Sequence, residues 1–536
     1  MTMMMTTGSL VRARRGRRRR ILGYLAAVIS IVLLSAGWSA ASPVGASPDE
    51  PSHVAYAWGV ITGQVLPGRA RETPPAGEEE GARQVEVTMP AELREVVSPD
   101  CYGGKTSEPA CAVVDADDSG ADVVVNSYMA RYSPVYYFVA GGVIRLALDL
   151  GFGVVSSIVL ARFVSGVISF GMIAVASILL GRRFGSVVST IVVAAAITPQ
   201  TLFLGASVNP NGFEVGASLL FAAAIASLFH DVHDSERVGV GLAWWLLIGG
   251  FCLAMARPAS VVWFCGLAML LFIPVNRRPV LWRIPAFAKV GLLITFLLSA
   301  ASFLYLNSGR EAGASGNDLT DWQNLPLIYR GVLILLKFGE LVRQGYGLLG
   351  WADTWMPALF LIMWIVVVVW AVSRMSVSRE RPVLRARWSF VFLLVCALAV
   401  AVQSDLAGFG WQGRYILPCL VAALALLAPG MAHSCLAASS QRLTAIVTAG
   451  IVAILDFGAI AINLGRYLYG YTELRIRFDQ LPVPQPDGTW VSVLGRFTPL
   501  VLAGIGTLTV LGLVVSQVRG AREQTVAGSS SLARQS

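Results

Sequence analysis

Charged side chains are scarce in this sequence. Asp, Glu, Lys and Arg make up 14% of the 536 residues, whereas soluble domains carry about 25%. The chain is instead 55% hydrophobic, with a mean hydropathy of +0.66. Its apolar runs repeatedly reach about 20 residues, enough to cross a hydrocarbon core of about 30 Å. This composition excludes an ordinary soluble domain and predicts an all-α polytopic membrane protein.

Three kinds of motif are also missing. There is no soluble Rossmann-like domain and no glycine loop that cradles phosphates, so nothing supports a nucleotide-sugar donor. No internal repeat is visible, parallel or inverted, which disfavours transporters built on repeats. An acidic cluster from Asp115 to Asp122 does not have the spacing of a calcium-binding loop, and we interpret it as a solvated face.

The net charge of +9 could suggest a nucleic-acid partner. The basic residues, however, cluster beside the ends of apolar runs, where the positive-inside rule places them. We interpret the basic head from Arg12 to Arg20 as a cytoplasmic anchor beside anionic lipid. The charge therefore predicts a multi-pass protein of the plasma membrane, with no nucleic-acid partner.

Alternation of basic loops predicts about 12 transmembrane helices, with both termini cytoplasmic. The first apolar run also resembles a signal peptide, but its length favours an uncleaved anchor. The predicted segments are a basic cytoplasmic tail (1–20), the first transmembrane helix (21–41), an extracytoplasmic loop with short interfacial helices (42–153), helices two to seven (154–306), a second extracytoplasmic loop with an interfacial helix (307–357), helices eight to twelve (358–518) and a cytoplasmic tail (519–536).

Two of the seven cysteines differ from the rest. Five lie in or beside apolar runs and are interpreted as small buried hydrophobic residues. Cys101 and Cys111 instead flank a short Gly/Ser/Pro loop in the longest polar segment. If that segment lies outside the cytoplasm, we expect a disulfide, because oxidising compartments preserve it. Two free thiols are the alternative.

Polar residues gather at the span ends that this topology places on the outer face. Prolines and glycines beside them can hold non-helical backbone, which is tolerated at membrane depth only where it is buried or lines water. Singly, each is an ordinary turn, a snorkelling arginine or an interfacial aromatic residue. Their convergence on one face predicts a site, and the stretches are Pro48-Asp49-Glu50-Pro51-Ser52-His53, Asn209-Pro210-Asn211, Arg257-Pro258, Gly350-Trp351-Ala352-Asp353 and Gln412-Gly413-Arg414-Tyr415.

This set of residues suits sugar transfer from a polyprenyl-phosphate carrier to a glycan or lipid acceptor outside the cytoplasm. Asp49 would be the general base, with Glu50 as its partner or as the ligand of a divalent cation such as Mg or Mn. Arginines bind phosphate bidentately, and aromatic rings stack on sugar faces. The predicted substrate-binding residues are His53, Asn209, Asn211, Arg257, Trp351, Asp353, Gln412, Arg414 and Tyr415.

One acidic residue lies away from this face. Asp456 falls inside the predicted eleventh span, where a carboxylate is costly in lipid and needs a partner. A structural hydrogen bond and a proton relay are both open interpretations.

Three of the outer motifs resemble those of a known family. The stretch from Pro48 to His53 resembles the N-terminal signature of the bacterial membrane proteins called domain of unknown function 2142 (DUF2142). The stretches beginning at Gly350 and Gln412 resemble the later signatures, and the similarity runs from about Ile21 to Val515. That family in turn resembles the C-type (GT-C) glycosyltransferases, which use lipid-phosphate sugars.

The resemblance implies a GT-C-like fold and an acidic motif in the first outer loop. It maps the catalytic acid onto Asp49 or Glu50, which are adjacent here, whereas the GT-C motifs often separate two acids by a spacer. Two other functions stay open. A transporter or flippase of a lipid-linked glycan predicts functional charges near mid-membrane, and a non-catalytic envelope protein predicts partner binding through the long first loop.

Overall fold

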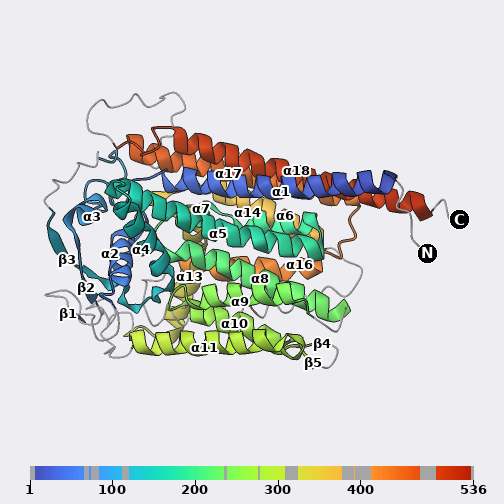
Figure 1. Cartoon of the computed structure of the whole chain (residues 1–536), viewed down its shortest axis with the longest axis horizontal. Helices are drawn as coiled ribbons and strands as arrows, with labels where there is room; N and C mark the ends of the chain where they lie inside the picture. Colours follow the sequence, from blue (N-terminus) through green and yellow to red (C-terminus); the bar gives the residue numbers. More distant parts are fainter. Residues whose placement is uncertain are drawn as a thin grey trace.

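The computed structural model describes residues 7–65, 72–73, 84–111, 120–234, 238–275, 278–307, 324–376, 392, 412–470 and 490–532. Long helices run side by side, with a small sheet and short helices at one end (Figure 1). Within this described part, eight helices are long and apolar enough to cross a membrane. They are α1 (Thr7–Ser39), α5 (Val154–Phe184), α8 (Pro210–Asp234), α11 (Ala286–Asn307), α14 (Ala358–Ser376), α16 (Leu417–Met431) together with the turn that precedes it from Gly413, α17 (Ala438–Tyr469) and α18 (Thr498–Leu532).

Further apolar helices complete the bundle. The helices α6 (Ser186–Ala196) and α7 (Pro199–Gly205) meet at 77°, and they make a ninth span if the bent pair counts as one. Two shorter ones are α9 (Val240–Ala254) and α10 (Ser260–Met269). The predicted ninth span, 389–402, lies outside the described residues apart from Phe392. The predicted number of about 12 spans therefore stays a prediction.

The helix α8 is the centre of the bundle. It packs against α5, α9 and α16, and 94% of its spanning window is buried. Small residues allow this close packing, as helix association in lipid requires. At the start of α8, a Cβ on Gly212 would lie 2.3 Å from the Cα of Gly205 in α7, so no larger residue fits where these two helices meet.

The segment between α1 and α5 contains a sheet as well as the predicted helices. Its helices are α2 (Glu50–Ile61), α3 (Ala91–Val96) and α4 (Pro134–Asp149). Its antiparallel sheet has the order β1 (Glu72–Thr73), β2 (Gln84–Pro90) and β3 (Asp122–Ser127). Alternate β2 residues are buried, as the two-residue period of a strand dictates, and α2 packs against this sheet. The prediction of helices alone was incomplete here.

Amphipathic α13 (Leu327–Gly347) packs on the short 3-10 helix η5 (Gly413–Tyr415) and on α7. Its residues Leu327, Ile328, Leu335 and Leu336 are 71–75% exposed, which is typical of a helix at a membrane interface. The other short elements are the 3-10 helices η1 (Tyr128–Arg131), η2 (Leu270–Phe272) and η3 (Val280–Arg283) and the hairpins β4 (Pro274–Val275)–β5 (Arg278–Pro279) and β6 (Leu348–Leu349)–β7 (Thr354–Trp355).

The two terminal helices are longer than the predicted spans. The helix α1 begins at Thr7, inside the predicted tail 1–20, and α18 continues to Leu532, beyond the predicted boundary at 518. The helix α1 begins and α18 ends at the same end of the bundle, opposite the sheet (Figure 1). The outer motifs therefore share the sheet end of the molecule.

Candidate functional site

Asp49 lies between α1 and α2, at the edge of the protein. Its φ of 63° is in the left-handed region that non-glycine residues rarely adopt. Its Oδ1 accepts a 2.7 Å hydrogen bond from the Tyr128 hydroxyl, and its Oδ2 accepts one of 2.7 Å from Arg414. The Asp49 side chain is 27% exposed, while that of Arg414 is 5% exposed. The carboxylate is thus held on two sides and open on another.

Two neighbouring groups control the ionisation of Asp49. Burial acts to raise the pKa of this carboxyl, but the Arg414 guanidinium and the Tyr128 hydroxyl together hold the pKa below its ordinary value. Asp49 is therefore ionised at neutral pH.

Two arginines from distant parts of the chain meet at Tyr415. The guanidinium carbon of Arg257 lies 4.2 Å from the centre of the Tyr415 ring, and that of Arg414 lies 5.2 Å from it. Both arginines are buried, and Nε of each and Nη1 of Arg414 have no hydrogen-bond partner among the described residues. An unsatisfied buried donor costs about 1–3 kcal/mol, so these nitrogens favour an anion.

Glu214 and Asn211 hold Arg257 in place. A terminal nitrogen of Arg257 donates to the Asn211 side-chain oxygen and lies 3.4 Å from a Glu214 carboxylate oxygen, while Ser260 donates to the other oxygen at 2.7 Å. Glu214 was not among the predicted site residues. Its signal was a lone carboxylate in an apolar run, three residues after Asn211 and hence on the same helix face.

Asn209 links the first loop to the start of α8. Its side-chain nitrogen donates to the Pro48 carbonyl at 2.9 Å, and its backbone nitrogen donates to the Tyr136 hydroxyl at 2.8 Å. Its side-chain oxygen accepts from the backbone nitrogen of Asn211 at 3.0 Å. Asn209 thus connects the residue before Asp49 with the asparagine that holds Arg257.

Glu50 points into the protein, away from the exposed side of Asp49. It is fully buried and forms a bidentate ion pair with Arg162 of α5, in which Nε lies 2.7 Å from Oε1. Backbone nitrogens of Gly45 and Val208 also donate to it at 2.9 Å. The remaining Arg162 donors reach the carbonyls of Ser39, Ser42 and Pro43. These contacts favour a structural role for Glu50.

His53 lies in a cluster of tyrosines behind Asp49. Its Nδ1 and the Tyr137 hydroxyl are 2.7 Å apart, and its ring meets that of Tyr132 edge-on at 5.8 Å. Burial lowers the pKa of His53 to about 3, although the charge of Asp49 acts in the opposite direction. His53 is therefore a neutral part of the wall. The hydroxyls of Tyr128 and Tyr132 at this wall were not predicted as site residues.

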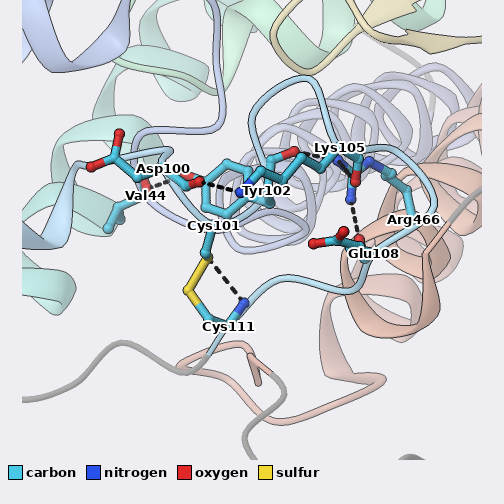
Figure 2. The surroundings of a disulfide bond; sticks show 8 residues. All are labelled: Val44, Asp100, Cys101, Tyr102, Lys105, Glu108, Cys111 and Arg466. Atoms are coloured by element: carbon cyan, nitrogen blue, oxygen red, sulfur yellow. Dashed lines mark hydrogen bonds between the residues drawn. A yellow bond between two sulfur atoms is a disulfide. The ribbon is translucent and has the colours of Figure 1, made fainter.

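A disulfide joins Cys101 and Cys111, and the loop between them packs on the end of α17 (Figure 2). Arg466 of α17 donates to the carbonyls of Tyr102 at 2.7 Å and Glu108 at 2.9 Å. The Tyr102 hydroxyl donates to the Val44 carbonyl at 2.9 Å, next to the segment that carries Asp49.

Trp351 and Asp353 contact this disulfide loop region. The Trp351 ring nitrogen donates to the Gly45 carbonyl at 2.8 Å, and Asp353 accepts from the backbone of Gly104 at 3.1 Å and lies 3.7 Å from Arg466. Among the described residues, no hydrogen bond or ion pair joins either side chain to Arg257 or Arg414. Gln412 contributes its backbone, since its carbonyl accepts from Tyr415 at 3.0 Å.

The residues described do not fit a divalent cation. They contain no group of three or more His, Cys, Asp or Glu side chains that could hold a metal. Both Glu50 oxygens accept from nitrogen donors, which is the wrong environment for a cation ligand. We therefore assign no step to a metal.

Several solved structures resemble this chain distantly. One is ArnT from Cupriavidus metallidurans bound to undecaprenyl phosphate, at 12% identity and a TM-score of 0.41, with 92% of this chain and 77% of that one covered. Another is the Archaeoglobus fulgidus oligosaccharyltransferase with zinc and sulfate (12%, 0.37, 84% and 53%). A third is AglB from the same organism with an inhibitory peptide and a dolichol-phosphate (11%, 0.38, 83% and 56%). At these TM-scores the likeness assigns neither a fold nor an activity.

Among curated proteins, no sequence matches the chain. A protein-family model, however, matches most of it. The model of the predicted membrane proteins called DUF2142 matches residues 3–423, a range that contains both the first acidic motif and Arg414. The chain therefore belongs to the DUF2142 family of predicted membrane proteins.

Proposed function

We propose that this protein is a membrane glycosyltransferase that moves a sugar from a polyprenyl-phosphate carrier to an acceptor hydroxyl on the extracytoplasmic face. The observation that carries the proposal is the juxtaposition of a partly exposed carboxylate, Asp49, with two buried arginines around Tyr415. The motif resemblance to DUF2142 and GT-C proteins supports it.

The two arginines suit a phosphate ester. Guanidinium groups bind phosphate oxygens through paired N–H donors, and three of these nitrogens have no partner among the described residues. Each arginine already has an acidic neighbour, Asp49 or Glu214. The site is thus close to neutral without substrate, and a carrier phosphate would add acceptors where donors are unsatisfied.

In the proposed reaction, the acceptor oxygen attacks the anomeric carbon of the sugar. The bond between that carbon and the carrier phosphate oxygen breaks, and Asp49 takes the acceptor's hydroxyl proton. The carrier leaves as polyprenyl phosphate, held by Arg257 and Arg414. When Arg414 turns toward phosphate, its ion pair with Asp49 weakens, so the pKa of Asp49 rises from its lowered value toward that of a better base.

The structure contains one observation that disfavours each of the two alternative functions, a transporter or flippase and a non-catalytic envelope protein. A transporter or flippase requires functional charges near mid-membrane, whereas Asp49 and Arg257 lie in connections at the sheet end of the helices. A non-catalytic envelope protein would need neither the partly exposed carboxylate nor the unsatisfied arginine nitrogens. Both alternatives remain outcomes of the test.

The first test asks whether the protein retains a carrier lipid. Wild type and an Arg257→Ala/Arg414→Ala variant would be purified in detergent and compared by native mass spectrometry. We expect polyprenyl phosphate on wild type and its loss from the variant. Arg145→Ala is the matched control, because Arg145 is exposed on α4, where it pairs with Asp149 and lies over the Trp58 ring. If neither wild type nor the control retains a carrier, the phosphate site is wrong.

The second test concerns chemistry. Asp49→Asn preserves the shape of the side chain but removes its capacity to accept a proton. We expect this variant to retain the carrier and to lose sugar transfer from a radiolabelled polyprenyl-phosphate sugar. Retained transfer would contradict the base assignment while leaving the phosphate site intact.

A further inference from the structure

The carboxylate of Asp49 does not cap the helix that it precedes. Asp49 is the N-cap residue of α2, a position where aspartate usually accepts a hydrogen bond from a backbone N–H of the first turn. Its side chain makes no such bond. The carboxylate points instead to Tyr128 and Arg414, so a contact that would stabilise α2 is replaced by two contacts at the site.

Each carboxylate oxygen of Asp49 has a different partner. The Tyr128 hydroxyl donates to Oδ1 and Nη2 of Arg414 donates to Oδ2, both at 2.7 Å. An ionised carboxylate only accepts hydrogen bonds, so the phenol is the donor in the first contact. Hydrogen bonds to the ionised form make a carboxylate a weaker proton acceptor. In this arrangement both oxygens of the proposed base are therefore engaged.

The sheet fixes the position of Tyr128. Tyr128 begins η1 directly after β3 ends at Ser127, which is paired with Val85 of β2. The Ser127 hydroxyl donates to the carbonyl of Ser52, in the first turn of α2, at 2.8 Å. The phenol and the carboxylate of Asp49 are thus both positioned relative to the start of α2, and Oδ1 stays engaged as long as the sheet packs there.

Arg414 is held less firmly, by one of its three side-chain nitrogens. Its Nη2 donates to Asp49 and, at 3.3 Å, to the Tyr415 hydroxyl, whereas Nε and Nη1 have no hydrogen-bond partner among the described residues. Arg162 differs, because its Nε and Nη2 both donate to Glu50 and its other donors reach backbone carbonyls. Of these two arginines, Arg414 is the one that can exchange its partner.

The shape of a guanidinium makes a phosphate compete with Asp49 for Arg414. The donors form two forks, Nε with Nη2 and Nη1 with Nη2, and an anion bound bidentately uses one of them. Both forks include Nη2, the nitrogen that donates to Asp49. A phosphate bound through either fork therefore takes a hydrogen of Nη2, and its negative charge repels the carboxylate that shares this nitrogen.

The titratable groups that face Asp49 come from three elements, and they are His53 of α2, Tyr128 of η1, and Arg414 and Tyr415 of η5. Burial lowers the pKa of His53 to about 3, so this ring is neutral at neutral pH. Arg414 is the cation among the four. When a phosphate takes Arg414, the Asp49 carboxylate loses its counter-charge, and its pKa rises.

We propose that the Arg414–Asp49 ion pair blocks the base until the carrier phosphate displaces it. The phosphate binds Arg414 and releases Oδ2, while Tyr128 keeps Oδ1 engaged. The acceptor's O–H bond then breaks as its proton passes to Oδ2. The base is available only in the carrier complex, so the carrier binds first and the acceptor second. This inference rests on the proposed function and adds to it an order of binding.

Binding of a polyprenyl monophosphate without a sugar tests the competition, by titration of the purified protein in detergent and native mass spectrometry. Asp49→Asn replaces the charge that holds Arg414 by a neutral amide, and asparagine tolerates the left-handed φ of this residue. We expect the variant to bind this lipid about threefold more tightly than wild type, or better, because an ion pair no longer opposes binding. Asp149→Asn is the matched control, since that exposed acid pairs with Arg145 on α4, and its affinity should equal that of wild type.

A double-mutant cycle separates competition for Arg414 from general charge repulsion. In an Arg414→Ala background, Asp49→Asn should produce little of this gain, because no arginine is released. An equal gain in both backgrounds overturns the proposal, and so does an affinity of Asp49→Asn at or below that of wild type. Asp49→Gly covers the case in which Asp49→Asn does not fold, because glycine adopts this φ without strain, and the same gain is expected.

The same titration separates this inference from the proposed function. If wild type, Asp49→Asn and Asp149→Asn all fail to bind the lipid phosphate, the phosphate site is wrong and the ordered binding is wrong with it. If wild type binds the lipid and neither Asp49→Asn nor Asp49→Gly binds it more tightly, the phosphate site stands and the blocking ion pair alone is refuted.

Discussion

Asp49 and Glu50 are adjacent in sequence, yet their carboxylates face different surroundings. Asp49 is at the edge of the protein with Tyr128 and Arg414, and Glu50 is inside with Arg162. A turn that gives Asp49 a φ of 63° separates the two. The left-handed conformation costs about 1 kcal/mol or more, so the contacts of Glu50 with Arg162 help to maintain the position of Asp49.

The first residue-scale prediction concerns this ion pair. Arg162→Ala leaves the Glu50 carboxylate buried without its cation, and breaking a buried pair costs about 3–5 kcal/mol. We expect a large loss of thermal stability, measured by unfolding in detergent. The matched control is Arg145→Ala, whose exposed pair with Asp149 is worth under about 1 kcal/mol. Equal stability of the two variants would show that Arg162 is not the anchor.

The second residue-scale prediction concerns pH. The pKa of His53 is about 3 in the fold and is near 6.5 when unfolded, so the unfolded chain binds an extra proton between these values. The contribution of neutral His53 to the free energy of unfolding is therefore complete above about pH 6.5. As the pH falls, protonation of the unfolded chain lowers the free energy of unfolding, by about 2 kcal/mol at pH 5. We expect His53→Gln to show a smaller loss of stability than wild type between pH 7 and 5. Parallel unfolding curves for the two proteins would refute this assignment.

At the scale of elements, the contact between α13 and η5 fixes the position of Arg414. Gly413 is pressed against α13, and a Cβ there would be 2.1 Å from the Leu341 carbonyl oxygen. The Gln344 side chain accepts from the Gly413 nitrogen at 2.8 Å. The helix was predicted as an interfacial one, but its contact with the Arg414 turn was not, because no local pattern links residues so far apart.

The element-scale prediction follows from this contact. Gly413→Ala must push η5 and α13 apart, which moves Arg414 from Asp49. We expect binding of the carrier phosphate to weaken by about tenfold or more, which is about 1.4 kcal/mol, as measured by lipid retention in native mass spectrometry. The control is Gly331→Ala on the same helix, where nothing lies within 4 Å of the added Cβ. Unchanged retention in Gly413→Ala would exclude α13 as a positioning element.

The small sheet is the element that the sequence analysis missed. Its strands β2 and β3 pair from Val85 with Ser127 to Pro90 with Asp122, across a polar segment rich in turn-forming residues. Short strands of this kind have little hydrophobic periodicity of their own. They form because α2 and α3 pack against β2 and β3, which is information that only tertiary packing supplies.

At the scale of the whole molecule, the sheet and the outer motifs lie at one end of the bundle. The connection between α16 and α17 lies at the other end of these helices, and its thiol Cys435, which the sequence predicted to be buried, is exposed. If the bundle spans the plasma membrane, these two ends are on opposite sides of it. The predicted orientation places the sheet outside and Cys435 in the cytoplasm.

The whole-molecule prediction uses this separation. In a chain that carries Val124→Cys on the exposed face of β3, we expect a membrane-impermeant maleimide to label position 124 in intact cells. Cys435 should react only after the membrane is permeabilised. Labelling of Cys435 in intact cells, with position 124 protected, would reverse the orientation.

The sequence by itself determined the class of protein and several residues of the candidate site. In lipid, the backbone N–H and C=O groups of apolar runs of this length are satisfied by forming helices. The disulfide that was expected between Cys101 and Cys111 is present. Asp49, Arg257, Arg414 and Tyr415 were predicted from their types and their places at span ends, and they do come together.

Only the tertiary structure decided the partners of these residues. Arg162 and Glu214 lie within apolar helices and carry no local signal of the loop or arginine that each one contacts. The inward direction of Glu50 and the contact of Trp351 with the Gly45 carbonyl likewise depend on backbone turns and long-range packing. A pattern of residue types specifies which face of an element is apolar, whereas the pairing of buried charges requires the positions of all the helices around them.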